Sequence, residues 1–129
     1  MSDLSIALGV TAGALKTQAA RLRHVAENIS NADTPGYHRK MISFRTETDG
    51  EGVTRVRPGD LQLDRSDLRS IYDPAHPLAD DTGHYDGSNV DVMIEIADAR
   101  EAQRSYEANL KMFDQTRQMS SALMELLRK

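Results

Sequence analysis

Several residue types are scarce in this 129-residue chain, and each scarcity excludes a class of protein. There is no cysteine, which excludes disulfide bonds, thiol catalysis and cysteine-ligated zinc. There is no tryptophan, and aromatic residues make up only 5% of the chain, so little large apolar material is available for a core. The net charge of −4 comes from interleaved charges of both signs, without the basic patch of nucleic-acid-binding proteins. We expect one domain that does not bind nucleic acid.

Long apolar runs are also missing. No segment reaches the roughly 18 consecutive apolar residues that a membrane span requires. The stretch from Leu4 to Leu15 resembles the core of a signal peptide, but Met1-Ser2-Asp3 supplies no basic leader, and the stretch continues into polar sequence without a clear stop. We therefore expect a soluble chain with neither a membrane span nor a cleaved signal.

What the chain does have is a helical apolar repeat near its start, which predicts a helix from about Leu4 to Ser30. Gly9 and Gly13 each weaken an isolated helix by ~1 kcal/mol relative to alanine, so we expect this helix to need partners. The repeat has the alternating four- and three-residue steps of a coiled-coil seam, at Leu4, Leu8, Thr11, Leu15, Gln18, Leu22, Val25 and Ile29.

A polar segment, from Asn28 to Tyr37, ends this helix sharply. Asn28 and Asn31 tolerate a left-handed cap, and Asp33-Thr34-Pro35-Gly36 has the chemistry of a turn. Pro35 cannot continue a helix and drives the preceding residue towards an extended conformation. We predict that this segment joins the helix to a different kind of structure.

The middle of the chain reads as short strands and turns. Residues suited to a half-buried strand run from Tyr37 to Thr46, and Val53-Thr54-Arg55-Val56 is expected to return beside them, closed by Pro58-Gly59. A further strand is predicted from Leu61 to Ile71. Residues 73–87 are dense in proline, glycine and aspartate, so we expect a turn-rich loop there.

A second helix is predicted after Ser88-Asn89-Val90-Asp91. Ser88 and Asp91 have the spacing of a capping box, and acidic residues suit a helix N-terminus. Its apolar register slips near Thr116-Arg117. The predicted seam comprises Val92, Ile96, Ala99, Gln103, Tyr106, Leu110 and Phe113, continued by Met119, Leu123 and Leu126 or Leu127.

Candidate chemical sites are weak by comparison. His24 is expected on the polar side of the first helix, and His38 in the turn after it. The sequence contains no nucleophile elbow, phosphate-binding glycine loop or dinucleotide fingerprint, so we expect no enzyme activity and no cofactor. One alternative is a calcium-binding module, although the loop lacks the regular ligand spacing of known calcium loops; its side chains would be Asp73, His76, Asp80, Asp81, His84 and Asp86.

These patterns predict an α+β fold in which long terminal helices form a coiled-coil-like pair around a small β-hairpin module. The predicted segments are an N-terminal assembly helix (1–33), the β module with its turn-rich loop (34–88) and a C-terminal assembly helix (89–129). At 1.5 Å per residue the second helix spans roughly 50 Å, more than so small a domain can cover. Its seam must therefore meet the first helix, another subunit, or both.

Two motifs resemble those of the bacterial flagellar rod, hook and hook-associated axial proteins. The first is Asn28-Ile29-Ser30-Asn31-Ala32-Asp33-Thr34-Pro35-Gly36-Tyr37 with His38-Arg39-Lys40 behind it. The second is Asn89-Val90-Asp91, then Glu95, then Arg104-Ser105-Tyr106-Glu107-Ala108-Asn109. The loop Tyr72–Asp80 is similar to that of proximal-rod members. The resemblance is tight at both ends and loose between about Thr46 and Arg69.

The resemblance implies a structural rod subunit that stacks helically through its terminal helices and transmits motor torque to the hook. Its implied partners are copies of itself, other rod proteins, the membrane-ring adaptor and the flagellar type III export apparatus, which exports such chains without a cleaved signal. The implied location is the periplasm-spanning rod of the basal body. Alternatives are another short axial subunit or a coiled-coil adaptor unrelated to flagella.

Two residue sets follow for testing. The assembly motif comprises Asn28, Asn31, Thr34, Pro35, Gly36 and Tyr37, which we expect to cap the helix or contact a neighbour. The subunit-interface seam comprises Leu8, Leu15, Leu22, Val25 and Ile29 on the first helix with Ile96, Tyr106, Asn109, Leu110 and Phe113 on the second.

Overall fold

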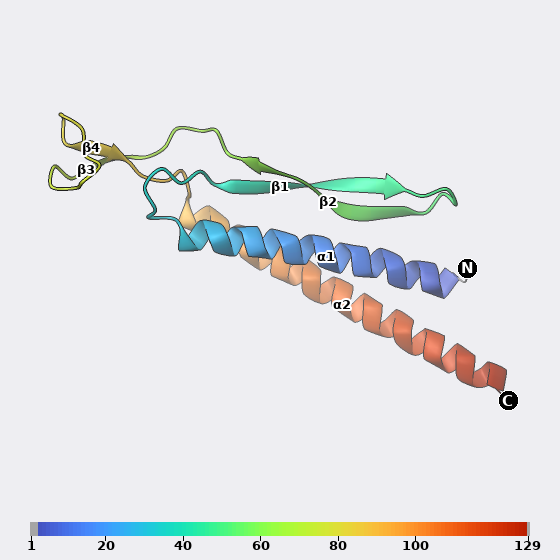
Figure 1. The fold of residues 1–129 in the computed structure, drawn as a ribbon. Helices are drawn as coiled ribbons and strands as arrows, with labels where there is room; N and C mark the ends of the chain where they lie inside the picture. The colour runs from blue at the N-terminus through green and yellow to red at the C-terminus, as the bar shows by residue number, and fades with distance from the viewer. Residues whose placement is uncertain (1–2, 129) are drawn as a thin grey trace.

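The computed structural model describes residues 3–128 and contains two long helices separated by two antiparallel hairpins (Figure 1). The predicted α+β fold, with terminal helices around a small β region, is confirmed. Met1, Ser2 and Lys129 lie outside the described residues, so the expectation for the first two residues stays a prediction. The elements are α1 (Asp3–Ser30), β1 (Lys40–Thr48), β2 (Thr54–Leu63), β3 (Ser70–Tyr72), β4 (His84–Asp86) and α2 (Val92–Arg128).

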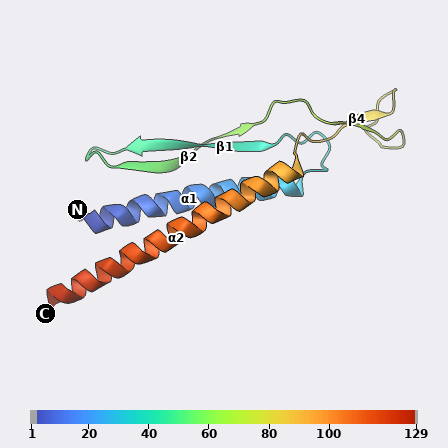
Figure 2. The same cartoon turned by 180° about the vertical axis from the view of Figure 1, so that it is seen from behind.

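Helix α1 lies in the middle of the molecule. The β1–β2 hairpin runs along one side of α1, and α2 packs on the other side, in both views (Figures 1 and 2). Helix α2 continues past the start of α1 and diverges from it, so its last two turns have no neighbour among the described residues (Figure 2). Neither helix is long and apolar enough to cross a membrane within the described residues.

The core is very small. In residues 3–128 the buried hydrophobic side chains are Ala20, Val25, Val90 and Ala102. Several buried positions are instead polar, notably Thr17, Asn28 and Glu95. Because these residues pack by hydrogen bonding as much as by apolar contact, the fold depends on a few polar side chains finding their partners.

The β1–β2 hairpin differs from its prediction at Pro58-Gly59, which does not close the second strand. Strand β2 continues to Leu63, and the pairing register shifts so that Ser43 of β1 faces two residues of β2. A bulge of this kind tolerates proline, which lacks the N–H of a regular ladder. A Cβ atom on Gly59 would lie 2.5 Å from Ser43 Oγ, so a glycine is needed at this close approach.

The predicted strand from Leu61 to Ile71 is also wrong, because its two ends belong to different hairpins. Its first residues complete β2, and its last residues begin β3, which pairs with β4. The segment 73–87, predicted as a loop, therefore contains a strand that sequence analysis missed. Three-residue strands such as β4 carry too short a pattern to be recognised.

Helix α2 begins with a simpler cap than predicted. The Asp91 carboxylate accepts hydrogen bonds from the backbone N–H groups of Met93 (3.0 Å) and Ile94 (3.4 Å). Asp91 is thus the N-cap, and Ser88 instead donates to the carbonyl oxygen of Ala32. The predicted capping box between Ser88 and Asp91 is therefore wrong. The register slip near residues 116–117 does not interrupt the helix.

Candidate functional site

The two sequence motifs, which are about 60 residues apart, meet at one end of the molecule. We call this site the joint and define it by Asn28, Tyr37, Arg39, Asn89 and Glu95. The end of α1, the start of β1 and the first turns of α2 all contribute to it. The convergence of two distant motifs makes the joint the strongest candidate for a functional feature.

Asn28 is the centre of the joint and is 1% exposed. Its Nδ2 donates to the Lys40 carbonyl oxygen (2.9 Å) and to Glu95 Oε2 (3.3 Å). Its Oδ1 accepts from the Tyr37 hydroxyl (2.8 Å) and from the Lys40 backbone N–H (2.9 Å). Every donor and acceptor of the amide is used within the chain, so Asn28 fastens α1 to β1 and α2 and does not cap α1 with a left-handed backbone.

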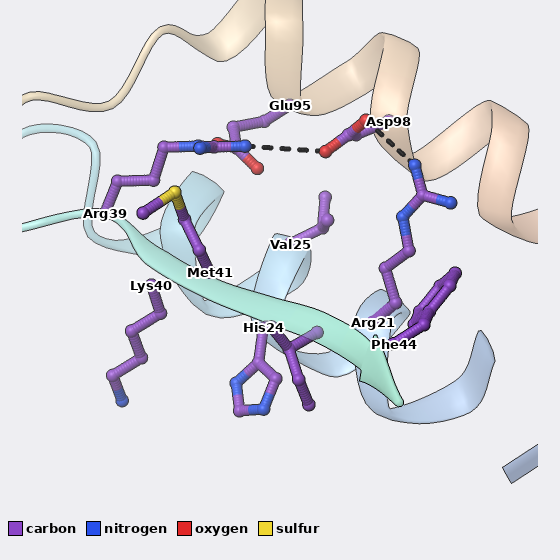
Figure 3. A pocket seen from close by; sticks show the side chains of 10 residues that line it. Arg21, His24, Val25, Arg39, Lys40, Met41, Phe44, Glu95 and Asp98 are labelled. Atoms are coloured by element: carbon purple, nitrogen blue, oxygen red, sulfur yellow. Dashed lines mark hydrogen bonds and ion pairs between the residues drawn. The ribbon is translucent and has the colours of Figure 1, made fainter. Parts of the chain in front are cut away.

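Glu95 is completely buried and lies beside Arg39, whose Nε forms an ion pair with it. The Arg39 guanidinium also reaches Asp98 on α2 (3.5 Å), and Asp98 in turn accepts a hydrogen bond from Arg21 of α1 (2.9 Å). Figure 3 shows Asp98 between the two arginines, beside a cavity of about 360 Å³. Cations and carboxylates alternate along this row, so each buried charge has a partner.

Asn89 completes the joint by linking β1 to the segment before α2. Its Oδ1 accepts a hydrogen bond from the Arg39 backbone N–H (2.6 Å), and its Nδ2 donates to the Asp64 carbonyl oxygen (2.9 Å). The Asp64 carboxylate caps its own turn by accepting from the Ser66 N–H, which lowers the pKa of Asp64. The strand, the turn and the helix start are therefore fixed to one another.

The rest of the assembly motif forms the turn that leads into β1. Asn31 Nδ2 donates to the Glu27 carbonyl oxygen (2.9 Å), and Asn31 Oδ1 accepts from the Thr34 hydroxyl (3.1 Å). The left-handed residue is Gly36, with φ of 74°, rather than either asparagine, since no other residue type in 3–128 has positive φ. Gly36 N–H points to the carbonyl oxygens of Asp86 and Gly87, whereas Pro35 is exposed.

Electrostatic effects around the joint are local. The hydrogen bond from Lys40 Nζ to Glu27 (3.0 Å) lowers the pKa of Glu27 and raises that of Lys40. Partial burial raises the pKa of the Tyr37 hydroxyl, so this group is a hydrogen-bond donor at neutral pH. These directions follow from the hydrogen bonds and the burial of a structural network.

The histidines and aspartates considered for metal binding have other positions. His24 is half-buried and lines the cavity of the joint, so its expected place on the polar side of α1 was wrong. Asp80 accepts three hydrogen bonds from Thr82 and His84, which lowers the pKa of Asp80 and closes the β3–β4 turn. Within residues 3–128 no group of three or more metal-ligating side chains lies together.

The residues of the predicted seam are only partly covered. Val25 is buried, whereas Ile29, Ile96 and Leu110 are 36%, 38% and 41% exposed. The half-buried members are Leu8, Leu15, Leu22, Tyr106, Asn109 and Phe113. The Asn109 side chain bonds to the Ser105 carbonyl oxygen of its own helix (2.9 Å). One chain therefore leaves much of the seam open to a partner.

Sequence reasoning missed the charged half of the joint. Arg39, Asp98 and Arg21 were in no predicted site, although Arg39 is the second residue after the first motif. A signal did exist for Asp98, because it lies three residues after Glu95 and so shares its helix face. Only the folded chain reveals that both carboxylates face Arg39.

Comparison with known proteins identifies the motifs. Residues 8–38 match the family "Flagella basal body rod protein", and residues 82–126 match "Flagellar basal body rod FlgEFG protein C-terminal". The flagellar basal-body rod protein FlgC of Agrobacterium fabrum is 45% identical, over 99% of this chain and 98% of its own length. The chain belongs to the FlgC family of flagellar basal-body rod proteins. The FlgC proteins of Yersinia enterocolitica and Bacillus subtilis are 32% and 30% identical, each over 92% of this chain.

The two family matches meet at the joint, because the first contains Asn28 and Tyr37 and the second contains Asn89 and Glu95. The first covers most of α1 and the assembly motif, and the second covers β4, the start of α2 and most of its length. The β1–β2 hairpin lies between the two matches, in the region where the resemblance is loose. The two regions that define the family are thus the ones that the joint holds together.

Proposed function

We propose that this chain is a structural subunit of the proximal flagellar rod, which assembles helically through α1 and α2 and so transmits motor torque to the hook. The observation that carries the proposal is the apolar surface that one chain cannot cover. On the C-terminal part of α2 the exposed hydrophobic residues are Met112, Met119, Leu123, Met124, Leu126 and Leu127, with exposures of 48–76%. So much exposed apolar surface marks an interaction site.

The energetics favour assembly over the isolated chain. Burying apolar surface stabilises a complex by roughly 25 cal/mol per Å², and the core of the single chain holds two valines and two alanines as its hydrophobic members among the described residues. Covering the open seam with helices of neighbouring subunits would give this small fold the core that it lacks. The joint would set the direction in which both helices leave the β module.

The proposed partners are copies of this chain, other rod proteins, the membrane-ring adaptor and, before assembly, the type III export apparatus. The proposed location is the periplasm-spanning rod, reached without cleavage of a signal peptide. In this proposal segments 1–33 and 89–129 are the assembly helices, and 34–88 is the outward module. The assembly motif positions the helices, and the seam residues contact neighbours.

Genetic deletion followed by complementation tests the proposal. Deletion should abolish swimming, and electron microscopy should reveal basal bodies without a rod. Complementation with Leu22→Asp should leave the protein expressed but block rod assembly, because a carboxylate cannot be buried in an apolar helix contact. Since Leu22 is half-buried, Leu123→Asp is the sharper variant: Leu123 is 48% exposed, so folding of the single chain tolerates the change.

The control is Gln118→Asp, which introduces the same charge at an exposed polar position of α2. It should support normal swimming. Normal swimming of Leu22→Asp and Leu123→Asp strains would reject the seam. Intact rods in the deletion strain would reject the proximal-rod function and favour another axial subunit or a non-flagellar adaptor.

A further inference from the structure

The β3–β4 hairpin and its loop carry charge of one sign. We call residues 70–87 the acidic arm, because they contain four aspartates and no lysine or arginine. All four carboxylates are on exposed residues, and none forms an ion pair with a cation in residues 3–128 (Asp73, Asp80, Asp81 and Asp86). Tyr72 and Leu78 are also 66% and 63% exposed. The arm extends beyond the joint and away from both helices (Figure 1).

A surface of the opposite character lies on the first turns of α2. We call it the outer groove, a depression of about 520 Å³ lined by Met93, Ile96, Ala97, Arg100, Glu101 and Arg104. Met93 is 76% exposed and Ile96 38% exposed, so its floor is apolar and open. Arg100 and Arg104 are exposed, and neither has an ion pair or hydrogen bond in the described part of the chain.

The outer groove faces away from the rest of its own chain. Helical spacing places Met93, Ala97, Arg100 and Arg104 on the side of α2 opposite to buried Glu95. Neither β3 nor β4 packs against α2, so the acidic arm of the same chain does not fill the groove. The groove and the arm are therefore both unoccupied surfaces of one chain with complementary charge and exposed apolar residues.

We propose that the acidic arm of one copy docks in the outer groove of a second copy. Leu78 and Tyr72 would cover the floor at Met93 and Ile96, and the aspartates of the arm would pair with Arg100 and Arg104. This deepens the proposed function, on which it rests, by naming one contact between subunits. The two surfaces differ, so the contact is head-to-tail and leaves a free arm and a free groove for the next copy.

Cysteine cross-linking of the full chain tests the contact directly, because the natural chain has no cysteine. Two variants at exposed positions, Leu78→Cys and Ala97→Cys, are mixed at high protein concentration and oxidised. The expected product is a mixed disulfide dimer that forms faster than either homodimer. The matched control replaces Ala97→Cys by Ser121→Cys, which is also at an exposed position of α2 but lies outside the groove.

Charge reversal separates this contact from chance collision. Arg100→Glu with Arg104→Glu should reduce the mixed dimer about tenfold, because like charges then face each other. Lys111→Glu with Arg128→Glu makes the same charge change at exposed α2 residues that form no ion pair within residues 3–128, and should have no such effect. Adding Asp81→Lys and Asp86→Lys to the arm should restore the dimer with the reversed groove.

The outcomes of these experiments either support or overturn the proposal. Preferential Leu78→Cys/Ala97→Cys pairing that responds to both reversals supports the proposal. Cross-linking equal to the Ser121→Cys control, or unchanged by the groove reversal, overturns it. The same cysteine pair in complemented cells distinguishes failure of this contact from failure of the proposed function. Rods that form without a disulfide between copies reject only the arm–groove contact. Rods in the deletion strain reject the proposed function.

Discussion

The ion pair at the joint allows a quantitative test through Arg39→Met. The substitution leaves the Glu95 carboxylate, which is 0% exposed, with only the Asn28 amide as a partner. Removing one member of a buried ion pair costs about 3–5 kcal/mol. We expect the lower end, about 3 kcal/mol, because the Arg39 side chain is 21% exposed and water can enter in its place.

The reciprocal change should cost less. In Glu95→Leu the Arg39 guanidinium keeps Asp98 and some solvent contact, and the Asn28 amide keeps the Lys40 carbonyl oxygen, so we expect a loss of about 1–2 kcal/mol. The double variant removes both charges and should lose no more than the Arg39→Met single variant, which gives a coupling energy of about 1–2 kcal/mol.

Urea unfolding of the full-length chain, followed by circular dichroism at 222 nm, measures all three variants. The matched control is Arg57→Met, which removes an arginine of β2 whose ion pair with Glu47 is exposed, and it should cost under about 1 kcal/mol. Strictly additive losses, or a smaller loss for Arg39→Met than for Glu95→Leu, would refute the assignment of a buried, coupled pair.

Further predictions concern other parts of the chain. Tyr37→Phe removes the hydroxyl that donates to Asn28 and should cost about 1 kcal/mol in the same urea assay. Because the pKa of Glu27 is lower in the folded chain than in the unfolded chain, ionised Glu27 stabilises the fold above the usual glutamate pKa. This stability is lost as the pH falls through the pKa of Glu27 in the folded chain. In Glu27→Gln, Tm should therefore fall less steeply below about pH 4.5. Gly36→Ala forces a side chain into positive φ and should lower stability by about 1 kcal/mol, measured by Tm. Amide exchange should be fastest in residues 121–128, which are all exposed, and slowest near Asn28.

Local patterns predicted the ends of the helices well. Pro35, which cannot continue a helix, and Gly36, which accepts positive φ, indicated from local chemistry that α1 ends before them, and the polar residues before Val92 indicated the start of α2 in the same way. The prediction that Pro58-Gly59 closes the second strand was wrong, because a proline-glycine pair is compatible with a turn and also with a β-bulge. The facing residue Ser43, more than a dozen positions away, decides between the two.

The polar contacts between residues far apart in the sequence could not be predicted for a different reason. Apolar periodicity selected leucines and isoleucines of the helices, yet the most deeply buried side chains of the joint are Asn28 and Glu95. A polar residue on a helix normally indicates a solvated face. Its burial becomes evident only when another segment, here the Arg39 strand, supplies the matching hydrogen bonds.

The joint also constrains when the chain can fold. Its contacts join Arg39 and Asn28 to a residue 56 and 67 positions later in the sequence, so about half of the chain separates the partners. Contacts of such separation form slowly, because a long loop must close before they contribute. In a ribosome-bound chain that ends before Glu95, α1 lacks this partner, so the native arrangement forms only after about three quarters of the chain has been synthesised. The position of Glu95 in the sequence therefore delays formation of the joint until late in synthesis.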